Sequence, residues 1–263
     1  MASIGNSRFY DIDGTQYPRV TYILSVISKP ALVNWAAKEE RMLVSEVAKD
    51  LYFDAVKLKK PLSEESFLLS LDTRLGKAKQ YQRTMTKASD IGTQAHGRVE
   101  WETRRMLGQV VGPEPTLRDE AMWAYMAWED WFKTHEVKPI FVEQRVHSKE
   151  FGYAGTLDLF AEVDGEPTVI DYKTSKSVYA ESFLQNFFYQ QALNEMGFGP
   201  ARKGLILRLP KLVSDPAFEA VEVPPFQQYW KLCLAVKTVW EWWHEEQMAY
   251  ETKRKAAKEA IAP

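Results

Sequence analysis

The sequence predicts a mixed α/β protein in which a helical region of roughly 135 residues precedes a core of strands and helices. Before Pro139, apolar residues recur at helical spacing, as they do over 31–56 and 117–134. After Pro139, short stretches alternate apolar and polar residues or are continuously apolar, which is typical of strands. Apolar residues make up 45% of the chain and aromatic residues 13%, which excludes a disordered protein.

The first predicted elements are a β-hairpin and an amphipathic helix. Two β-prone stretches flank Asp13-Gly14, a dipeptide that fits a type I′ turn. Pro30 then begins a helix in which Trp35 and Leu43 belong to the apolar face. The chain therefore enters its helical region through a short hairpin.

Further helices are predicted before the strands begin. One covers 63–71, another holds a group of basic residues, and a third is capped by Asp90 and ends before Gly108. The helix over 117–134 is rich in aromatic residues at helical spacing.

The core follows in the order three strands, a helix, two strands and a helix. The predicted elements are strands over 140–148, 155–163 and 168–175, a helix over 180–196, strands over 203–210 and 218–224, and a helix over 226–249. Asp164-Gly165 makes the tight turn between the second and third strands. The predicted parts are residues 1–88 as a hairpin and helical region that could clamp DNA, 89–250 as the core, and 251–263 as a charged tail.

Composition excludes several classes of protein. The only cysteine is Cys233, so an intramolecular disulfide, a cysteine-ligated iron–sulfur cluster and a cysteine-rich zinc site are all excluded. The sequence contains no stretch of the roughly 18 apolar residues that a membrane span needs, and no phosphate-binding loop of an ATP-driven motor. The start of the chain does not resemble a secretory signal, so a cytoplasmic protein is expected.

The net charge of −2 does not indicate a nucleic-acid-binding protein, but local clustering of charge matters more. A basic cluster follows Asp72 without another acidic residue. Its members are Arg74, Lys77, Lys79, Arg83 and Lys87. Two interpretations are open: a solvated helix face, or a surface that contacts nucleic-acid phosphates. The second gains support only if a site for phosphate chemistry lies elsewhere in the chain.

Three charged residues lie in otherwise apolar strands. Asp158 belongs to the second strand, and Asp171 and Lys173 belong to the third, on one face because side chains alternate. Buried charges need a partner or an ion, and two neighbouring carboxylates repel each other unless a cation neutralises them. Oxygen ligands favour Mg²⁺ or Mn²⁺, and an adjacent ammonium suits phosphodiester hydrolysis. The alternative is a structural ion-pair network without chemistry.

The order and spacing of these residues resemble a known family, the PD-(D/E)XK nuclease superfamily, and within it the RecB-like exonuclease branch. The matching motifs, in order, are G-x-x-x-H at 92–96, Glu143, G-x-x-D at 155–158, D-x-K at 171–173 and Q-x-x-x-Y at 185–189. The sequence has Leu157 where proline would precede the first aspartate. The resemblance implies a restriction-endonuclease-like core, in which helices flank a central mixed sheet.

The resemblance also implies roles for the matching residues. Asp158 and Asp171 would be the carboxylate ligands of the catalytic ion, with the Tyr172 carbonyl and His96 as further ligands, and Lys173 would orient the attacking water or stabilise charge. The remaining catalytic candidates are Glu143, Gln185 and Tyr189. Glu143 would complete a second metal site or hold Lys173, and the other two would support the active site or contact the nucleic-acid strand. The histidines without a motif, predicted to be surface residues, are His135, His147 and His244.

The function implied is a metal-dependent DNA exonuclease that acts in recombination, repair or phage DNA processing. Its cofactor would be Mg²⁺ or Mn²⁺ without an iron–sulfur cluster, as in members similar to the mitochondrial genome-maintenance exonuclease. Its partner would be DNA with a free single-stranded end, together with a recombination or annealing protein, in a bacterial cytoplasm and encoded by host or phage. Two other functions stay open: a structure-specific endonuclease, and a non-catalytic subunit that binds nucleic acid.

Overall fold

The structure, a computed structural model, describes residues 8–59, 61, 63–76, 79–212 and 214–259. Contacts divide the chain into two compact units. The first unit comprises Met1–Ile27 and Gly92–Pro263, and the second comprises Ser28–Ile91. Helix α4 (Gln80–Met106) crosses from the second unit into the first.

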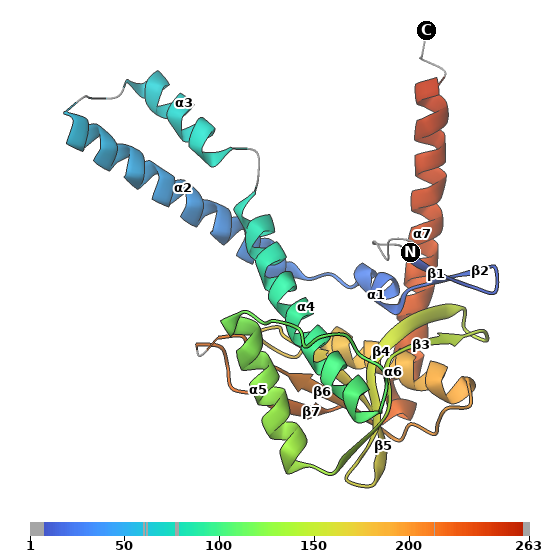
Figure 1. Cartoon of the computed structure of the whole chain (residues 1–263). Helices are drawn as coiled ribbons and strands as arrows, with labels where there is room; N and C mark the ends of the chain where they lie inside the picture. The colour runs from blue at the N-terminus through green and yellow to red at the C-terminus, as the bar shows by residue number, and fades with distance from the viewer. Residues whose placement is uncertain (1–7, 60, 62, 77–78, 213, 260–263) are drawn as a thin grey trace. The chain divides into compact units, whose positions relative to one another are not determined.

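A five-stranded mixed sheet forms the centre of the first unit (Figure 1). Its strands, in spatial order, are β3 (Val137–Ser148), β4 (Tyr153–Val163), β5 (Glu166–Lys173), β6 (Lys203–Arg208) and β7 (Glu219–Glu222). Only β5 and β6 are parallel, and helix α6 (Ala180–Glu195) makes the crossover between them. The predicted order of strands and helices, and the mixed α/β fold with flanking helices, are confirmed.

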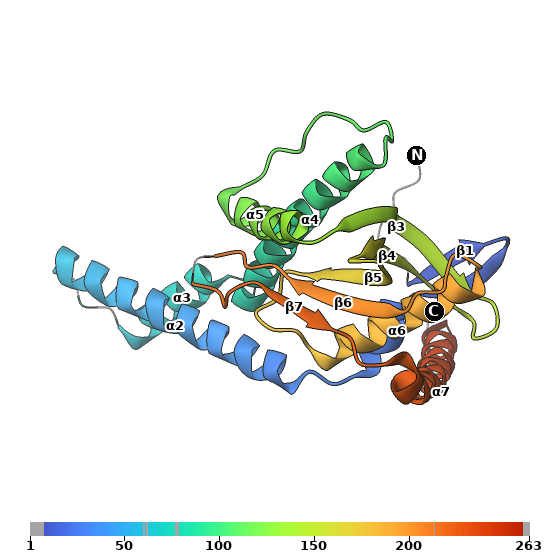
Figure 2. The ribbon, with the colours of Figure 1, turned by 90° about the horizontal axis from the view of Figure 1, so that it is seen from below.

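Helices cover both faces of the sheet, as Figure 2 shows. On one face, α6 packs with α7 (Phe226–Glu259) around a core that includes Leu157, Phe187 and Phe188. On the other face, α5 (Asp119–Thr134) contacts β5 where the Trp128 indole donates a hydrogen bond to the Tyr172 hydroxyl at 3.2 Å. The buried strands are apolar on both sides because helices cover both sides.

The N-terminal hairpin belongs to the first unit. Strands β1 (Phe9–Ile12) and β2 (Thr15–Pro18) are antiparallel, and Asp13 and Gly14 have φ of 53° and 78° between them, which confirms the predicted turn. The hairpin is followed by α1 (Val20–Ile23) and the short 3-10 helix η1 (Leu24–Val26). The sequence grouped the hairpin with the helical region, whereas its contacts in the structure join it to the core unit.

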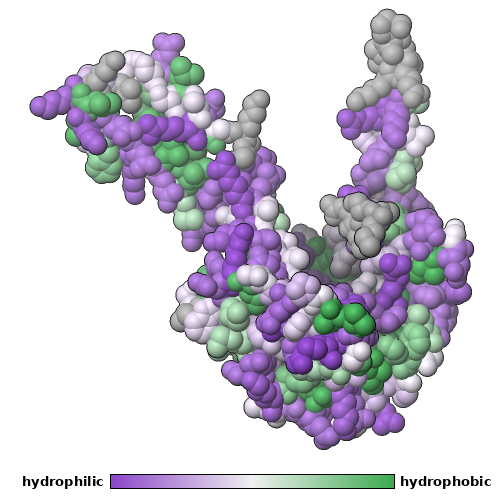
Figure 3. All heavy atoms as spheres, viewed as in Figure 1, coloured by the Kyte–Doolittle hydropathy of each residue, from purple (hydrophilic) through white to green (hydrophobic). Residues whose placement is uncertain are grey.

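The second unit consists of α2 (Pro30–Leu58), α3 (Glu64–Leu75) and the beginning of α4. Pro30 is at the start of α2, as predicted, and the Ser63 hydroxyl caps α3 by accepting from the Ser66 backbone N–H. The described residues of this unit include few buried side chains: many apolar residues of α2 and α3 are exposed, and Figure 3 shows them among hydrophilic neighbours.

Two helix ends differ from the prediction. Asp90 does not cap a helix, because α4 is continuous from Gln80 to Met106 and passes through it. Helix α7 continues to Glu259, because residues 250–259 include neither proline nor glycine. None of the helices in the described part of the chain is long and apolar enough to cross a membrane.

Candidate active site

Two carboxylates and a lysine meet where β4 and β5 lie side by side. Leu159 is opposite Ile170 in this antiparallel pair, so Asp158 and Asp171 follow at neighbouring positions. The Asp158 carboxylate accepts a hydrogen bond from the Tyr172 backbone N–H at 2.7 Å. The Asp171 side chain is fully buried, and its Oδ2 lies 2.6 Å from the Lys173 Nζ.

The electrostatics of this carboxylate cluster (Asp158, Asp171 and Lys173) reflect burial and mutual charge. Burial raises the pKa of Asp158, and it raises the pKa of Asp171 to about 6, although Lys173 opposes both shifts. For Lys173, burial lowers the pKa, but Asp171 and Asp158 together outweigh burial and the net pKa is raised. The cluster therefore holds a protonated amine beside two carboxylates at neutral pH.

A chain of hydrogen bonds connects Lys173 to helix α6. The Lys173 ammonium donates to Gln185 Oε1 at 3.1 Å, and the Gln185 amide donates to the Tyr189 hydroxyl at 3.0 Å. Tyr189 is 3% exposed, and its ring lies directly against β4 at Gly155, where an added Cβ would be 2.4 Å from the ring. Residues four apart on one helix face thus connect the lysine to a buried ring packed on the neighbouring strand.

Strand β3 is irregular where it passes Asp158. Glu143 has φ of 48°, a left-handed conformation that costs a non-glycine residue free energy. The β3–β4 pairing runs from Val142 with Leu159 to Gln144 with Leu157. Burial, then Asp158 and Glu100, raise the pKa of Glu143 to about 8. Strain and an altered pKa coincide beside the predicted catalytic aspartate, which is typical of functional sites.

His96 approaches the cluster from α4. Gly92, one turn earlier, lets the helix lie close to the end of β5, because a Cβ there would be 2.7 Å from the Thr174 hydroxyl. The His96 and Tyr172 rings meet edge to face at 5.9 Å, and His96 hydrogen-bonds the Tyr172 backbone. Burial lowers the pKa of His96, and Lys173 adds to this effect while Asp171 opposes it. The imidazole is consequently neutral at neutral pH, as a metal ligand must be.

The buried carboxylates fit a divalent cation. Asp171 Oδ1 has no hydrogen-bond partner among the described residues, and such an oxygen is a suitable ligand for a hard cation. Within the same described residues, no group of three or more His, Cys, Asp or Glu side chains is arranged to hold a metal. The structure thus brings Asp158 and Asp171 together, while His96 contacts the backbone and ring of Tyr172 instead of completing a three-ligand site.

The basic cluster belongs to the second unit, at the end of α3 and the beginning of α4. Arg74 pairs with Asp54 of α2 at 2.7 Å, and Lys79 lies over the Tyr81 ring at 5.8 Å. Arg83 and Lys87 are exposed. Lys77 is outside the described residues. The surface is basic, although Arg74 is partly neutralised by its ion pair.

Sequence reasoning missed several residues around the site. Glu100 lies one turn after His96 on α4 and influences the pKa of Glu143, so the spacing of the two residues was an available signal. Trp128 holds the Tyr172 hydroxyl. The Tyr10 hydroxyl of the hairpin lies 2.8 Å from the Thr156 hydroxyl of β4, and no local sequence pattern predicts this contact.

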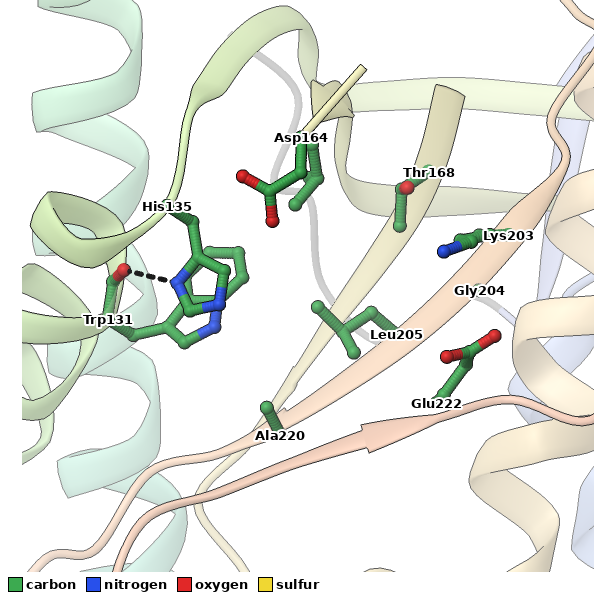
Figure 4. Close-up of a pocket in the computed structure, with 10 residues that line it drawn as sticks. Trp131, His135, Asp164, Thr168, Lys203, Gly204, Leu205, Ala220 and Glu222 are labelled. Atoms are coloured by element: carbon green, nitrogen blue, oxygen red, sulfur yellow. Dashed lines mark hydrogen bonds between the residues drawn. The ribbon is translucent and has the colours of Figure 1, made fainter. Parts of the chain in front are cut away.

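A pocket of about 220 Å³ lies elsewhere on the first unit and is shown in Figure 4. Its lining residues include none of those predicted for the site. His135, predicted to be a surface residue, is half-buried there: its Nδ1 donates to the Trp131 carbonyl at 2.9 Å and its ring stacks on Trp131. His147 and His244 also lie half-buried against aromatic rings, which corrects the prediction for all three.

Comparisons with known proteins identify the family of the chain. The chain is similar to an alkaline exonuclease (LHK-Exo) from Laribacter hongkongensis, at 13% identity over 70% of this chain and 88% of that chain, with a TM-score of 0.36. A structure of LHK-Exo in complex with dAMP gives 13% identity, coverage of 65% and 91%, and a TM-score of 0.34. No curated protein matches the chain. The family model of the PD-(D/E)XK nuclease superfamily matches residues 66–258, so the chain belongs to this superfamily.

Proposed function

We propose that the protein is a metal-dependent deoxyribonuclease that removes nucleotides from a DNA end, with Asp158, Asp171 and Lys173 at its centre. The observation that carries the proposal is the buried ion pair of Lys173 and Asp171 beside Asp158, in a chain of a nuclease superfamily. Charged groups are retained in an apolar sheet at a cost, and catalysis accounts for that cost.

The proposed roles follow from the contacts. Asp158 and Asp171 would hold Mg²⁺ or Mn²⁺, with His96 and the Tyr172 carbonyl as further candidates; when bound, the ion would supply an activated water and neutralise charge on the phosphate. Lys173, protonated and held by Asp171 and Gln185, would stabilise the negative charge that develops on the phosphate.

The surrounding residues would position this centre. Gln185 and Tyr189 would fix the Lys173 amine, and Glu143 would act beside Asp158. The basic cluster of the second unit would bind phosphates along the strand. We propose exonuclease rather than endonuclease action from the resemblance to the RecB-like branch, with DNA recombination, repair or phage DNA processing as the setting.

A cleavage assay tests the function. Linear single- and double-stranded DNA labelled at either end, and a closed circular single strand, are incubated with Mg²⁺, Mn²⁺ or EDTA, beside Lys173→Ala. We expect metal-dependent loss of linear DNA only, and none with the variant. Cutting of the circle would instead indicate an endonuclease. A folded wild-type protein that cuts nothing would contradict the proposal and favour a binding subunit.

A further inference from the structure

We propose that Arg19 and Arg145, gathered around Tyr10, form a binding site for a nucleic-acid phosphate next to the carboxylate cluster. The inference rests on the proposed function, because it assigns a ligand to the surface beside the proposed active site. All three residues belong to the first unit, and they come from three segments: the hairpin, the residue after it, and β3.

One aromatic ring brings the two arginines together. The guanidinium carbon of Arg19 lies 4.4 Å from the centroid of the Tyr10 ring, and that of Arg145 lies 4.8 Å from it. The ring is itself fixed, because the Tyr10 hydroxyl hydrogen-bonds the Thr156 hydroxyl at 2.8 Å. Contact with an aromatic face orders a guanidinium group and leaves its N–H groups available to a ligand.

The charge of this pair is not balanced by the protein. No carboxylate in the described part of the chain pairs with Arg19 or Arg145, and the buried Nε of Arg19 has no hydrogen-bond partner there. Other arginines of the unit do have acidic partners: Arg98 with Glu114, Arg104 with Glu100, and Arg208 with Glu219. Two positive charges at one ring repel each other, and an anion with several acceptor oxygens relieves the repulsion and satisfies the free N–H groups.

The position of the two arginines indicates that they would bind a phosphate close to the phosphodiester that is cleaved. Arg145 is opposite Thr156 in the β3–β4 pairing, and Thr156 precedes Asp158 by two residues, a distance of about 7 Å along a strand. The arginines therefore lie beside the catalytic centre, where a neighbouring phosphate of the same strand would reach them.

Two kinds of phosphate could occupy this site, a phosphodiester within the strand and a phosphate monoester at its end. A binding assay distinguishes the two. It measures binding of a fluorescently labelled single-stranded oligodeoxynucleotide to the full chain, in EDTA to prevent cleavage. The oligonucleotide is prepared with a hydroxyl or a phosphate at each end. Affinity is measured against salt concentration for wild type, Arg19→Gln, Arg145→Gln and the control Arg202→Gln. Arg202 is exposed and lies just before β6. Its backbone N–H donates to the carbonyl of Pro167 near the start of β5, whereas Asp171 lies near the other end of that strand.

Each phosphate contact contributes about 0.7 to the slope of log affinity against log salt for single strands. We expect Arg19→Gln and Arg145→Gln each to lower the slope by about 0.7, and Arg202→Gln to leave it unchanged. A loss with every oligonucleotide assigns an internal phosphate, and a loss only with one phosphorylated end assigns that end. Arg145 is exposed on β3, so its variant remains informative if the Arg19 variant fails to fold.

The outcomes that overturn the inference are distinct from those that overturn the function. Equal slopes for all four proteins would refute the phosphate site while DNA binding, and with it the proposed function, remained supported. A wild-type protein without affinity for any oligonucleotide would refute the phosphate site, whereas the proposed function is refuted only when the metal-containing cleavage assay shows no cutting. Recovery of the slope by Arg145→Lys would show that the charge, rather than a change in folding, is responsible.

Discussion

The contact of Gly155 with Tyr189 allows a specific prediction about the packing that positions Lys173. A methyl group at position 155 would have its carbon 2.4 Å from Cε1 of the Tyr189 ring, closer than any real contact. The ring is 3% exposed on a helix packed into the core, so it has little room to move. We expect Gly155→Ala to lower the free energy of unfolding by about 1–3 kcal/mol, as overpacking does.

The same substitution should reduce cleavage, because Tyr189 is the last member of the chain that holds the lysine. A displaced ring loses the hydrogen bond to Gln185, which in turn accepts from the Lys173 ammonium. Urea unfolding gives the change in the free energy of unfolding. An unchanged m-value, the slope of that free energy against urea concentration, confirms that only stability has changed. The rate of cleavage of linear DNA, measured where both proteins are folded, gives the functional effect.

Two variants control this experiment. Gly97→Ala adds the same methyl group to α4, where it would meet no atom within 4 Å beyond its own stretch of the helix, and should stabilise the protein by up to about 1 kcal/mol through helix propensity. In a Tyr189→Leu background, Gly155→Ala should cost less, because the ring has gone. If Gly155→Ala unfolds and cleaves like the wild type, the packing of Tyr189 on β4 is wrong. If only stability falls, the connection to Lys173 is wrong.

Two further predictions concern the acidic residues. In EDTA, the free energy of unfolding should fall as pH rises from about 4.5 to 8, because the folded chain keeps protons on Glu143 and Asp171 that the unfolded chain has lost. Thermal melts across this range measure the effect. The melting temperature should fall less in the presence of Mg²⁺ and, near pH 8, in the Glu143→Gln variant. Asp158→Asn should weaken Mg²⁺ binding in calorimetry without unfolding the protein, since an amide oxygen still accepts from the Tyr172 N–H; an unchanged Mg²⁺ affinity would remove Asp158 from the ligands.

The order of the core elements could be predicted because its signals are local. Alternating side chains mark β3, β4 and β5, and the Asp164-Gly165 turn takes the left-handed conformation that its residues favour, with φ of 50° and 84°. The Asp90 cap failed because an aspartate is compatible with a helix interior when neither neighbour interrupts the helix. A capping residue indicates where a helix is able to begin, but the surrounding sequence decides whether it does.

The site could be predicted only as far as its residues follow a spacing. The carboxylates, the lysine and the glutamine–tyrosine pair are set by strand alternation and the helix repeat, so their meeting follows once the strands pair. The contact of Tyr10 with Thr156 joins residues 146 positions apart, and the left-handed Glu143 reflects the local fit of two strands. Both depend on tertiary packing, which no short pattern contains.

The charge state of Lys173 follows from the structure and could not be predicted from the spacing of the motif. The sequence left two roles open for this amine, a base that orients water and a charge that stabilises the phosphate. Burial alone would favour a neutral amine, whereas the adjacent carboxylates favour an ammonium, and the carboxylates prevail because Asp171 lies at 2.6 Å. Since a protonated amine cannot accept a proton, the balance of these forces favours the electrostatic role in the proposed mechanism.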